Sequence, residues 1–298
     1  MAGTSVLFDA PGPRGRIRNQ IAAYVTGALA VLIAAAVLWR FAEKGQFTWA
    51  KWEPFLTANL WQTYLLPGLQ GTLTAAALSI VLALVLGLLL GVGRLSQLWL
   101  LRWPCAVLVE FFRAVPVLIM MIFSFSVFGL YDVVPSKYQA LAGVVTGLTL
   151  YNGAVIAEIV RAGVHALPRG QSEAAASLGL SSGQTMRAIL LPQAITSMLP
   201  VLVSQMVVVL KDTAIGYQIL FLEVVRQSTN LGSAYGNYIP ALIVVAVLLI
   251  TINFALSTFA TWLERRLRRS RRGPAPLDAE AAEQEGAPGA QVLPSQRD

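Results

Sequence analysis

The chain contains very few side chains that bind metals or form covalent crosslinks. Its 298 residues include one cysteine, Cys105, and one histidine, His165. A single cysteine excludes a disulfide within the chain, and this composition argues against a zinc or cysteine metal cluster. Charged residues are also scarce, at 12%, whereas hydrophobic residues make up 56%. Such a balance is typical of a polytopic membrane protein rather than a soluble globular domain.

The sequence also lacks a nucleotide-binding loop. Such a loop needs glycine followed by lysine and then serine or threonine, because the lysine and the backbone amides hold the phosphates. None of the lysines follows a glycine; they are Lys44, Lys51, Lys137 and Lys211. We therefore expect no ATP hydrolysis by this chain and predict that it is not an enzyme.

Apolar runs long enough to cross a bilayer recur along the chain. Pro67-Gly68 predicts a break before the second run, because proline removes a helical hydrogen bond. The pattern predicts an all-α polytopic membrane protein with about six transmembrane helices. The expected spans are residues 21–39, 71–92, 103–131, 138–157, 188–210 and 239–262.

Basic residues predict the orientation of these spans. With both termini inside, the cytoplasmic side holds most of the arginines, including the cluster at residues 265–272, and few cations lie outside. This asymmetry has the sign that the positive-inside rule requires. Residues 1–20 are then a cytoplasmic segment, and residues 264–298 are a basic stop followed by a disordered cytoplasmic tail poor in apolar residues. We expect a multi-pass protein of the bacterial plasma membrane.

One polar interruption, residues 158–192, separates two apolar stretches. Its charges exclude a lipid-facing segment, so we expect a loop in water. Residues 169–178 favour a helix that Gly179 would end. Ser181 or Ser182 can cap a second short helix that runs to Leu190 and ends near Pro192. The sequence therefore predicts a compact knob of two short helices, suited to a partner's surface.

Seven positions of this loop resemble the EAA loop of ABC-importer permeases: Glu173, Ala174, Ala175, Gly179, Ile189, Leu191 and Pro192. The alternative is that the loop is an ordinary cytoplasmic hairpin between two membrane helices. The segments VEFFRAVPVLIMMIF, ILLPQA and LKDTAIGYQI also resemble the polar amino-acid uptake branch, most of all the actinobacterial glutamate permeases. The resemblance implies an ABC type-1 permease domain over residues 63–263, and residues 21–62 would add a first transmembrane helix and an external connector.

The resemblance also implies a function and a set of partners. The chain would be the permease of an ATP-driven importer for a polar amino acid, glutamate being favoured by the likeness. Two copies of an ABC ATPase subunit would bind ATP and Mg, with no cofactor or metal in this chain. An extracytoplasmic binding protein would deliver substrate, and a sister permease or second copy would complete the path, within membrane lipid and without nucleic acid. The alternative is an ion-gradient-driven secondary transporter, although no internal repeat supports it.

Polar residues near membrane depth are candidates for a substrate path because they are costly there. We single out Lys211, Asp212, Thr213 and Asn152. Lys211 can attract a substrate carboxylate, or it can extend to the outer interface while Asp212 caps the next helix. Asn152 can line a polar path or bond a neighbouring helix. Glu110 and Arg113, three residues apart, are expected to form mainly a structural pair. Glu158 and Arg161 have the same spacing and are expected to brace the entry to the loop.

Overall fold

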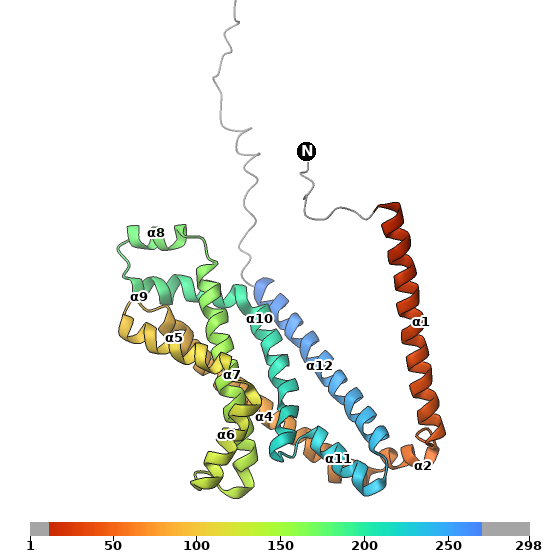
Figure 1. Cartoon of the computed structure of the whole chain (residues 1–298). Coiled ribbons are helices and arrows are strands. Elements are labelled where there is room, and N and C mark those ends of the chain that lie inside the picture. The colour runs from red at the N-terminus through yellow and green to blue at the C-terminus, as the bar shows by residue number, and fades with distance from the viewer. Residues whose placement is uncertain (1–11, 270–298) are drawn as a thin grey trace, which may run out of the picture. The chain divides into compact units, whose positions relative to one another are not determined.

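The computed structural model describes residues 12–269, and these residues form helices and no strands (Figure 1). The predictions for residues 1–11 and 270–298 lie outside the described part. The α-helices are α1 (Pro13–Glu43), α2 (Trp49–Trp52), α3 (Ala58–Leu60), α4 (Leu66–Arg94), α5 (Trp99–Ala114), α6 (Val117–Leu130), α7 (Gln139–His165), α8 (Gly170–Ser177), α9 (Ser182–Thr185), α10 (Leu191–Asp212), α11 (Val224–Tyr235) and α12 (Tyr238–Arg269).

Five continuous helical stretches in the described residues are long and apolar enough to cross a membrane, and a bent helix pair brings the number to as many as six. This confirms the all-helical prediction of about six spans. The continuous stretches are Pro13–Glu43, Ala58–Arg94, Ser136–His165, Ser182–Ile219 and Tyr238–Phe259.

The third predicted span, residues 103–131, is not one continuous helix. The segment is divided into α5 and α6, whose axes differ by 102°. Val115, between them, has the extended angles φ −81° and ψ 128°. Proline disfavours the helical conformation in the residue before it, so Pro116 forces this break. Hydropathy alone does not show the break, because apolar residues lie on both sides of it.

The predicted helix ends at Pro67 and Pro192 are also wrong. Helical structure continues through both prolines, and each is preceded by a π-helical turn: Trp61–Leu65 before α4 and Met186–Leu190 before α10. A π turn widens the helix just where proline removes a hydrogen bond and crowds the preceding turn. Each proline is therefore accommodated near the start of an α-helix without ending the span.

The chain divides into two compact units. One comprises the described part of residues 1–71 with residues 222–247, and the other comprises residues 72–221 with the described part of 248–298. The second unit holds a core formed by α4, α6, α7 and α10, with Ala75, Met121, Leu148 and Val209 buried in it. Helices α6 and α7 approach closely at Gly147, where a Cβ would lie only 2.6 Å from Met121 Cγ.

The first unit has its own packing. Glu223 begins α11, and its buried carboxylate accepts hydrogen bonds from the backbone N–H groups of Val225 (2.7 Å) and Arg226 (2.6 Å). The Nδ2 group of Asn237 donates to the carbonyl of Lys51. Helix α1, in contrast, buries none of its residues within the chain. Its apolar side chains are therefore available to lipid, as expected of a spanning helix.

Candidate functional site

The polar interruption forms the predicted short helix α8 and the predicted turn at Gly179. The second helix is not short, because helical structure runs from Ser182 to Ile219 without a break. Helix α8 ends at Leu178, and Gly179 follows with φ +75°. The Gly179 N–H donates to Ala176 O at 2.9 Å, and the Leu180 N–H donates to Ala175 O at 3.1 Å. These two bonds form a Schellman motif, in which glycine takes the left-handed conformation without a steric penalty.

A capping box starts the second helix. The side chain of Ser181 accepts a hydrogen bond from the Gln184 backbone N–H at 3.4 Å, and the Gln184 side chain accepts one from the Ser181 N–H at 2.8 Å. Ser181, rather than Ser182, is therefore the cap. With both ends of the turn held by hydrogen bonds, residues 170–185 form a rigid unit, which we call the knob.

Side-chain contacts hold the knob against the helical bundle. Leu191, at the start of α10 shortly after the knob, packs against the buried cluster of Ala83, Ile156, Val160 and Leu202. The Nε2 group of Gln193 donates to Gln171 Oε1 at 3.3 Å, which joins α10 to α8. From the loop after α4, Gln97 Nε2 donates to Ser182 Oγ at 2.8 Å. A force on the knob can therefore reach α4, α7 and α10.

The structure brings the two parts of the predicted EAA-like motif together, because α8 contacts the turn Met186–Leu190. Ala175 is fully buried there, whereas Glu173, Ala174 and Gly179 are exposed. The residue that sequence reasoning missed is Leu178, whose side chain is 79% exposed. An apolar residue just before the Gly179 turn was the available signal. An exposed leucine on a rigid polar loop is suited to insertion into a partner's pocket.

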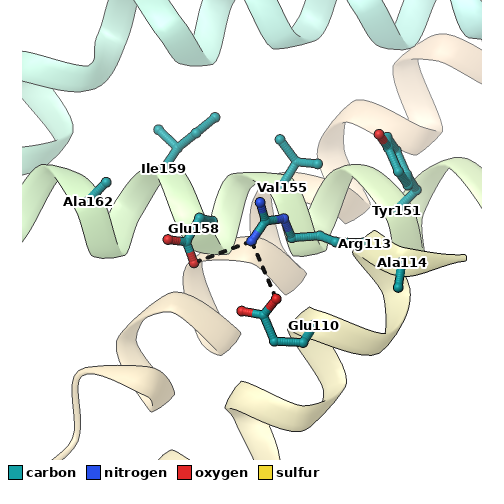
Figure 2. A pocket seen from close by; sticks show the side chains of 8 residues that line it. All are labelled: Glu110, Arg113, Ala114, Tyr151, Val155, Glu158, Ile159 and Ala162. Atoms are coloured by element: carbon teal, nitrogen blue, oxygen red, sulfur yellow. Dashed lines mark ion pairs between the residues drawn. The ribbon is translucent and has the colours of Figure 1, made fainter.

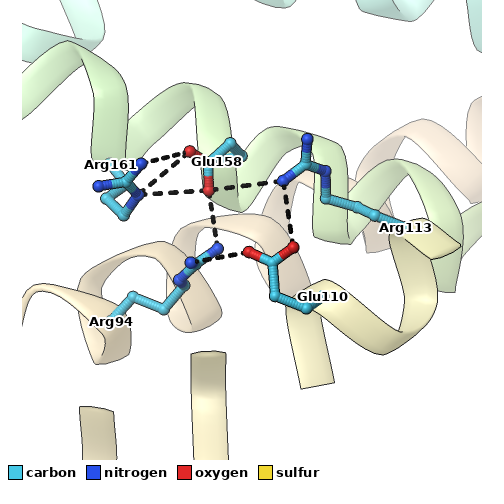
Figure 3. A network of polar contacts seen from close by, with 5 residues as sticks. All are labelled: Arg94, Glu110, Arg113, Glu158 and Arg161. Carbon is cyan, nitrogen blue, oxygen red and sulfur yellow. Dashed lines mark hydrogen bonds and ion pairs between the residues drawn. The ribbon is translucent and has the colours of Figure 1, made fainter. Parts of the chain in front are cut away.

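A network of ion pairs lies where the loop leaves α7 (Figure 3). The Glu158 carboxylate lies 2.7 Å from Arg94 Nη1 and 2.6 Å from Arg161 Nη2. Arg94 also binds Glu110 at 3.0 Å, and Arg113 lies 3.8 Å from Glu110 and 3.7 Å from Glu158. The predicted pairs Glu110–Arg113 and Glu158–Arg161 are both present, but they belong to one network that Arg94 joins. Its three arginines and two glutamates leave one net positive charge.

A cavity of about 570 Å³ borders this network, between α5 and α7 (Figure 2). Tyr151 closes one side of it, and the Arg113 guanidinium lies between the two carboxylates. Such a volume is in the usual range for small-molecule sites. The cavity combines a cation, two anions and apolar surface; it is lined by Glu110, Arg113, Ala114, Tyr151, Val155, Glu158, Ile159 and Ala162.

The remaining predicted residues lie on α7, α10 and the turn after α10. Lys211 is exposed, Asp212 is half-buried, and the buried Thr213 donates its hydroxyl to Leu210 O at 2.7 Å. Asn152 is fully buried: it donates to Leu148 O at 2.9 Å and accepts from Gln205 Nε2 at 2.7 Å. The structure thus brings Asn152 of α7 together with Gln205 of α10. Of the two roles expected for Asn152, it shows the hydrogen bond to a neighbouring helix.

The described residues thus form a helical bundle of membrane-spanning length with an exposed knob between two of its spans, an architecture that suits a multi-pass transport permease. The model of the family "Binding-protein-dependent transport system inner membrane component" matches residues 83–269. The glutamate transport system permease protein of Corynebacterium glutamicum is 55% identical to this chain, covering 76% of it and 83% of the relative. The probable glutamine ABC transporter permease protein of Bacillus subtilis is 37% identical, covering 70% and 94%.

The fold has solved counterparts. A crystal structure of an amino acid ABC transporter with histidines matches with a TM-score of 0.62 and 28% identity, over 68% of this chain and 93% of that chain. The chain belongs to the inner-membrane components of binding-protein-dependent transport systems: it is an ABC-importer permease of the amino-acid uptake branch. It is thus an integral protein of the bacterial inner membrane that works with ABC-type partner subunits.

Proposed function

We propose that this permease carries glutamate, delivered by an extracytoplasmic binding protein. The support is the 55% identity to a protein named as a glutamate permease. Further relatives carry names that include glutamate, aspartate or glutamine, among them the glutamate/aspartate import permease of Escherichia coli at 28% identity. Family membership leaves the ion-gradient alternative without support.

The knob is the proposed coupling element, and its geometry carries the proposal. Its turn is fixed by the Schellman bonds and the capping box, Leu178 is 79% exposed, and Leu191 connects it to the bundle core. A rigid unit of this kind transmits displacement instead of absorbing it. ATP-driven closure of two ATPase subunits would move the knob and open the path to the other side, and hydrolysis would reset it.

The remaining partners follow from this arrangement. ATP and Mg would bind to the ATPase subunits, since this chain has no glycine–lysine nucleotide loop and would not hydrolyse ATP itself. A second copy of the chain, or a sister permease, would complete the path. Both termini would be cytoplasmic, because the knob and most arginines must then face the ATPase side.

For the substrate path we propose Lys211, Asp212, Thr213 and Asn152. Lys211 is exposed in the last turn of α10, where a substrate carboxylate would meet its ammonium group. Thr213 and Asn152 are already hydrogen-bonded within the chain, so they would shape the path more than they bind substrate.

Uptake of labelled glutamate tests this proposal. Cells lacking the gene would receive the intact chain, Leu178→Met or Leu178→Asp. The intact chain and Leu178→Met should restore uptake, since both keep an apolar side chain on the knob. Leu178→Asp should abolish uptake at normal membrane levels, because a charge cannot enter an apolar pocket without a large desolvation cost. Normal uptake with Leu178→Asp would contradict the coupling role, and no glutamate uptake from the intact chain would contradict the substrate.

A further inference from the structure

A second cavity lies between the ends of α4 and α7 and the start of α5. It shares no lining residue with the cavity beside Arg113, although arginines of the same ion-pair network line it. Its volume is about 560 Å³. Three arginines and the single histidine line it, together with two tryptophans: Arg94, Arg102, Arg161, His165, Trp99 and Trp103. No acidic side chain of the described residues lines it.

The cavity carries an excess of positive charge. Arg94 and Arg161 are held by Glu158, at 2.7 and 2.6 Å, so their guanidinium groups are fixed in place (Figure 3). Arg102 forms no ion pair with any described residue. A guanidinium without a carboxylate partner, next to two others, favours an anion with oxygen acceptors, and phosphate matches the fork of arginine best.

The surroundings of Arg102 are apolar and aromatic. Trp99 and Trp103 lie three and one residues from Arg102 on α5, with 67% and 65% of their surfaces exposed. Leu100 and Leu101 of the same turn are 66% and 53% exposed. Indole rings and arginines beside exposed leucines are typical of the membrane–water interface. There the rings and cations meet the lipid headgroups, and the leucine side chains are covered by the acyl chains of the lipids.

The length and direction of α5 fit the same location. Its 16 residues extend about 24 Å, which is less than the hydrocarbon core of about 30 Å, and the break before α6 turns the chain by 102°. Helix α5 is therefore too short to cross the membrane alone. Its first turn lies directly after α4 and beside the end of α7, next to the knob side of the bundle.

We propose that this cavity binds the phosphate headgroup of an anionic phospholipid in the cytoplasmic leaflet, with Arg102 as its principal contact. The assignment of the cavity to the cytoplasmic leaflet rests on the proposed function, which places the knob in the cytoplasm. Basic pockets between helices on that side are the known form of headgroup sites. The ATPase surface is the competing occupant, but the exposed tryptophans and leucines of α5 suit acyl chains better than a soluble subunit.

Native mass spectrometry of the purified permease–ATPase complex tests the site, with added phosphatidylglycerol or phosphatidylcholine of the same acyl chains. Arg102→Gln removes the charge and Arg102→Lys keeps it. Arg18→Gln makes the same charge change on α1, which contributes nothing to the cavity lining. We expect the intact complex to retain phosphatidylglycerol in preference to phosphatidylcholine. Arg102→Gln should weaken that retention about fivefold, the effect of one interfacial cation, while Arg102→Lys and Arg18→Gln leave it nearly unchanged.

Any of the following results would overturn the proposal. Equal retention of the two lipids, or equal retention by Arg102→Gln and the intact chain, would remove the headgroup site. Displacement of the lipid by inorganic phosphate would assign the site to a soluble anion. Loss of the ATPase subunit from Arg102→Gln, with lipid retention unchanged, would assign the surface to the subunit interface. Lipid retention is measured without transport, so a failure to carry glutamate would affect only the proposed function.

Discussion

Arg94 at the end of α4 and Glu158 on α7 are joined by a 2.7 Å ion pair, although 64 residues separate them in the sequence. Arg94 is 12% exposed and Glu158 is 24% exposed, so water screens this pair only partly. Glu158 also holds Arg161 and lies within the last two turns of α7 before the loop that carries the knob. The pair therefore fixes the base of that loop to the first helix of the second unit.

Glu158→Gln should destabilise the protein, because it leaves Arg94 and Arg161 without their closest anion. We expect a loss of roughly 1–3 kcal/mol, which is below the cost of breaking a fully buried pair since these groups are partly exposed. Glu43→Gln is the matched control: it breaks the exposed Arg40–Glu43 pair of α1 and should cost less than about 0.5 kcal/mol. Thermal unfolding in detergent measures both. Equal melting temperatures for the two variants would show that the network does not stabilise the fold.

Gly179→Ala should distort the knob, whereas Gly183→Ala should not. A Cβ would meet no atom within 4 Å at either position, so space does not separate them. Of these two glycines, only Gly179 has a positive φ, a conformation that costs an L-residue about 1–2 kcal/mol. We expect Gly179→Ala to lower substrate-stimulated ATP hydrolysis by the assembled importer and Gly183→Ala to leave it unchanged. The same activity in both variants would mean that the Schellman turn is not needed for coupling.

The features that were predictable from the sequence depend on neighbouring residues. Gly179, the Ser181 cap and the Glu158–Arg161 pair all follow from short spacings, and all are present. The features that were missed depend on geometry. The break at Pro116 lies inside a long, mainly apolar segment, and the helices continue through Pro67 and Pro192 because π turns precede both prolines. The role of Arg94 requires the packing of distant helices, which no local pattern contains.

Lys211→Met should abolish glutamate uptake if its ammonium group meets the substrate carboxylate. Methionine keeps the length and most of the apolar stem of the side chain while removing the charge. Lys211→Arg is the control that keeps the charge, and it should retain part of the activity. Uptake kinetics at normal membrane levels provide the measurement. Unchanged kinetics in Lys211→Met would show that Lys211 only extends to the membrane interface.

Glu223 should make the stability of α11 depend on pH. Burial raises the pKa of Glu223 from its ordinary value of 4.5 to about 7, although the N–H groups of Val225 and Arg226 oppose part of this shift. The folded protein therefore holds the proton more tightly than the unfolded chain does. Glu223 favours folding most below pH 4.5, and this contribution is lost as the pH rises to about 7.

Hydrogen exchange of the α11 amides at about pH 5 and about pH 8, corrected for intrinsic rates, tests this effect. Protection should be higher at the lower pH in the intact chain. Glu223→Gln, which cannot ionise, should reduce the difference between the two conditions. The same difference in Glu223→Gln would assign the pH dependence to another group.

The most direct test of the central claim uses proteoliposomes that contain the permease, its ATPase subunits and the glutamate-binding protein. Ionophores collapse all ion gradients, and ATP is either sealed inside with the ATPase or omitted. The account predicts glutamate uptake that requires ATP, persists with the ionophores and is absent in Leu178→Asp. Uptake that proceeds without ATP and stops when the ion gradients collapse would contradict it.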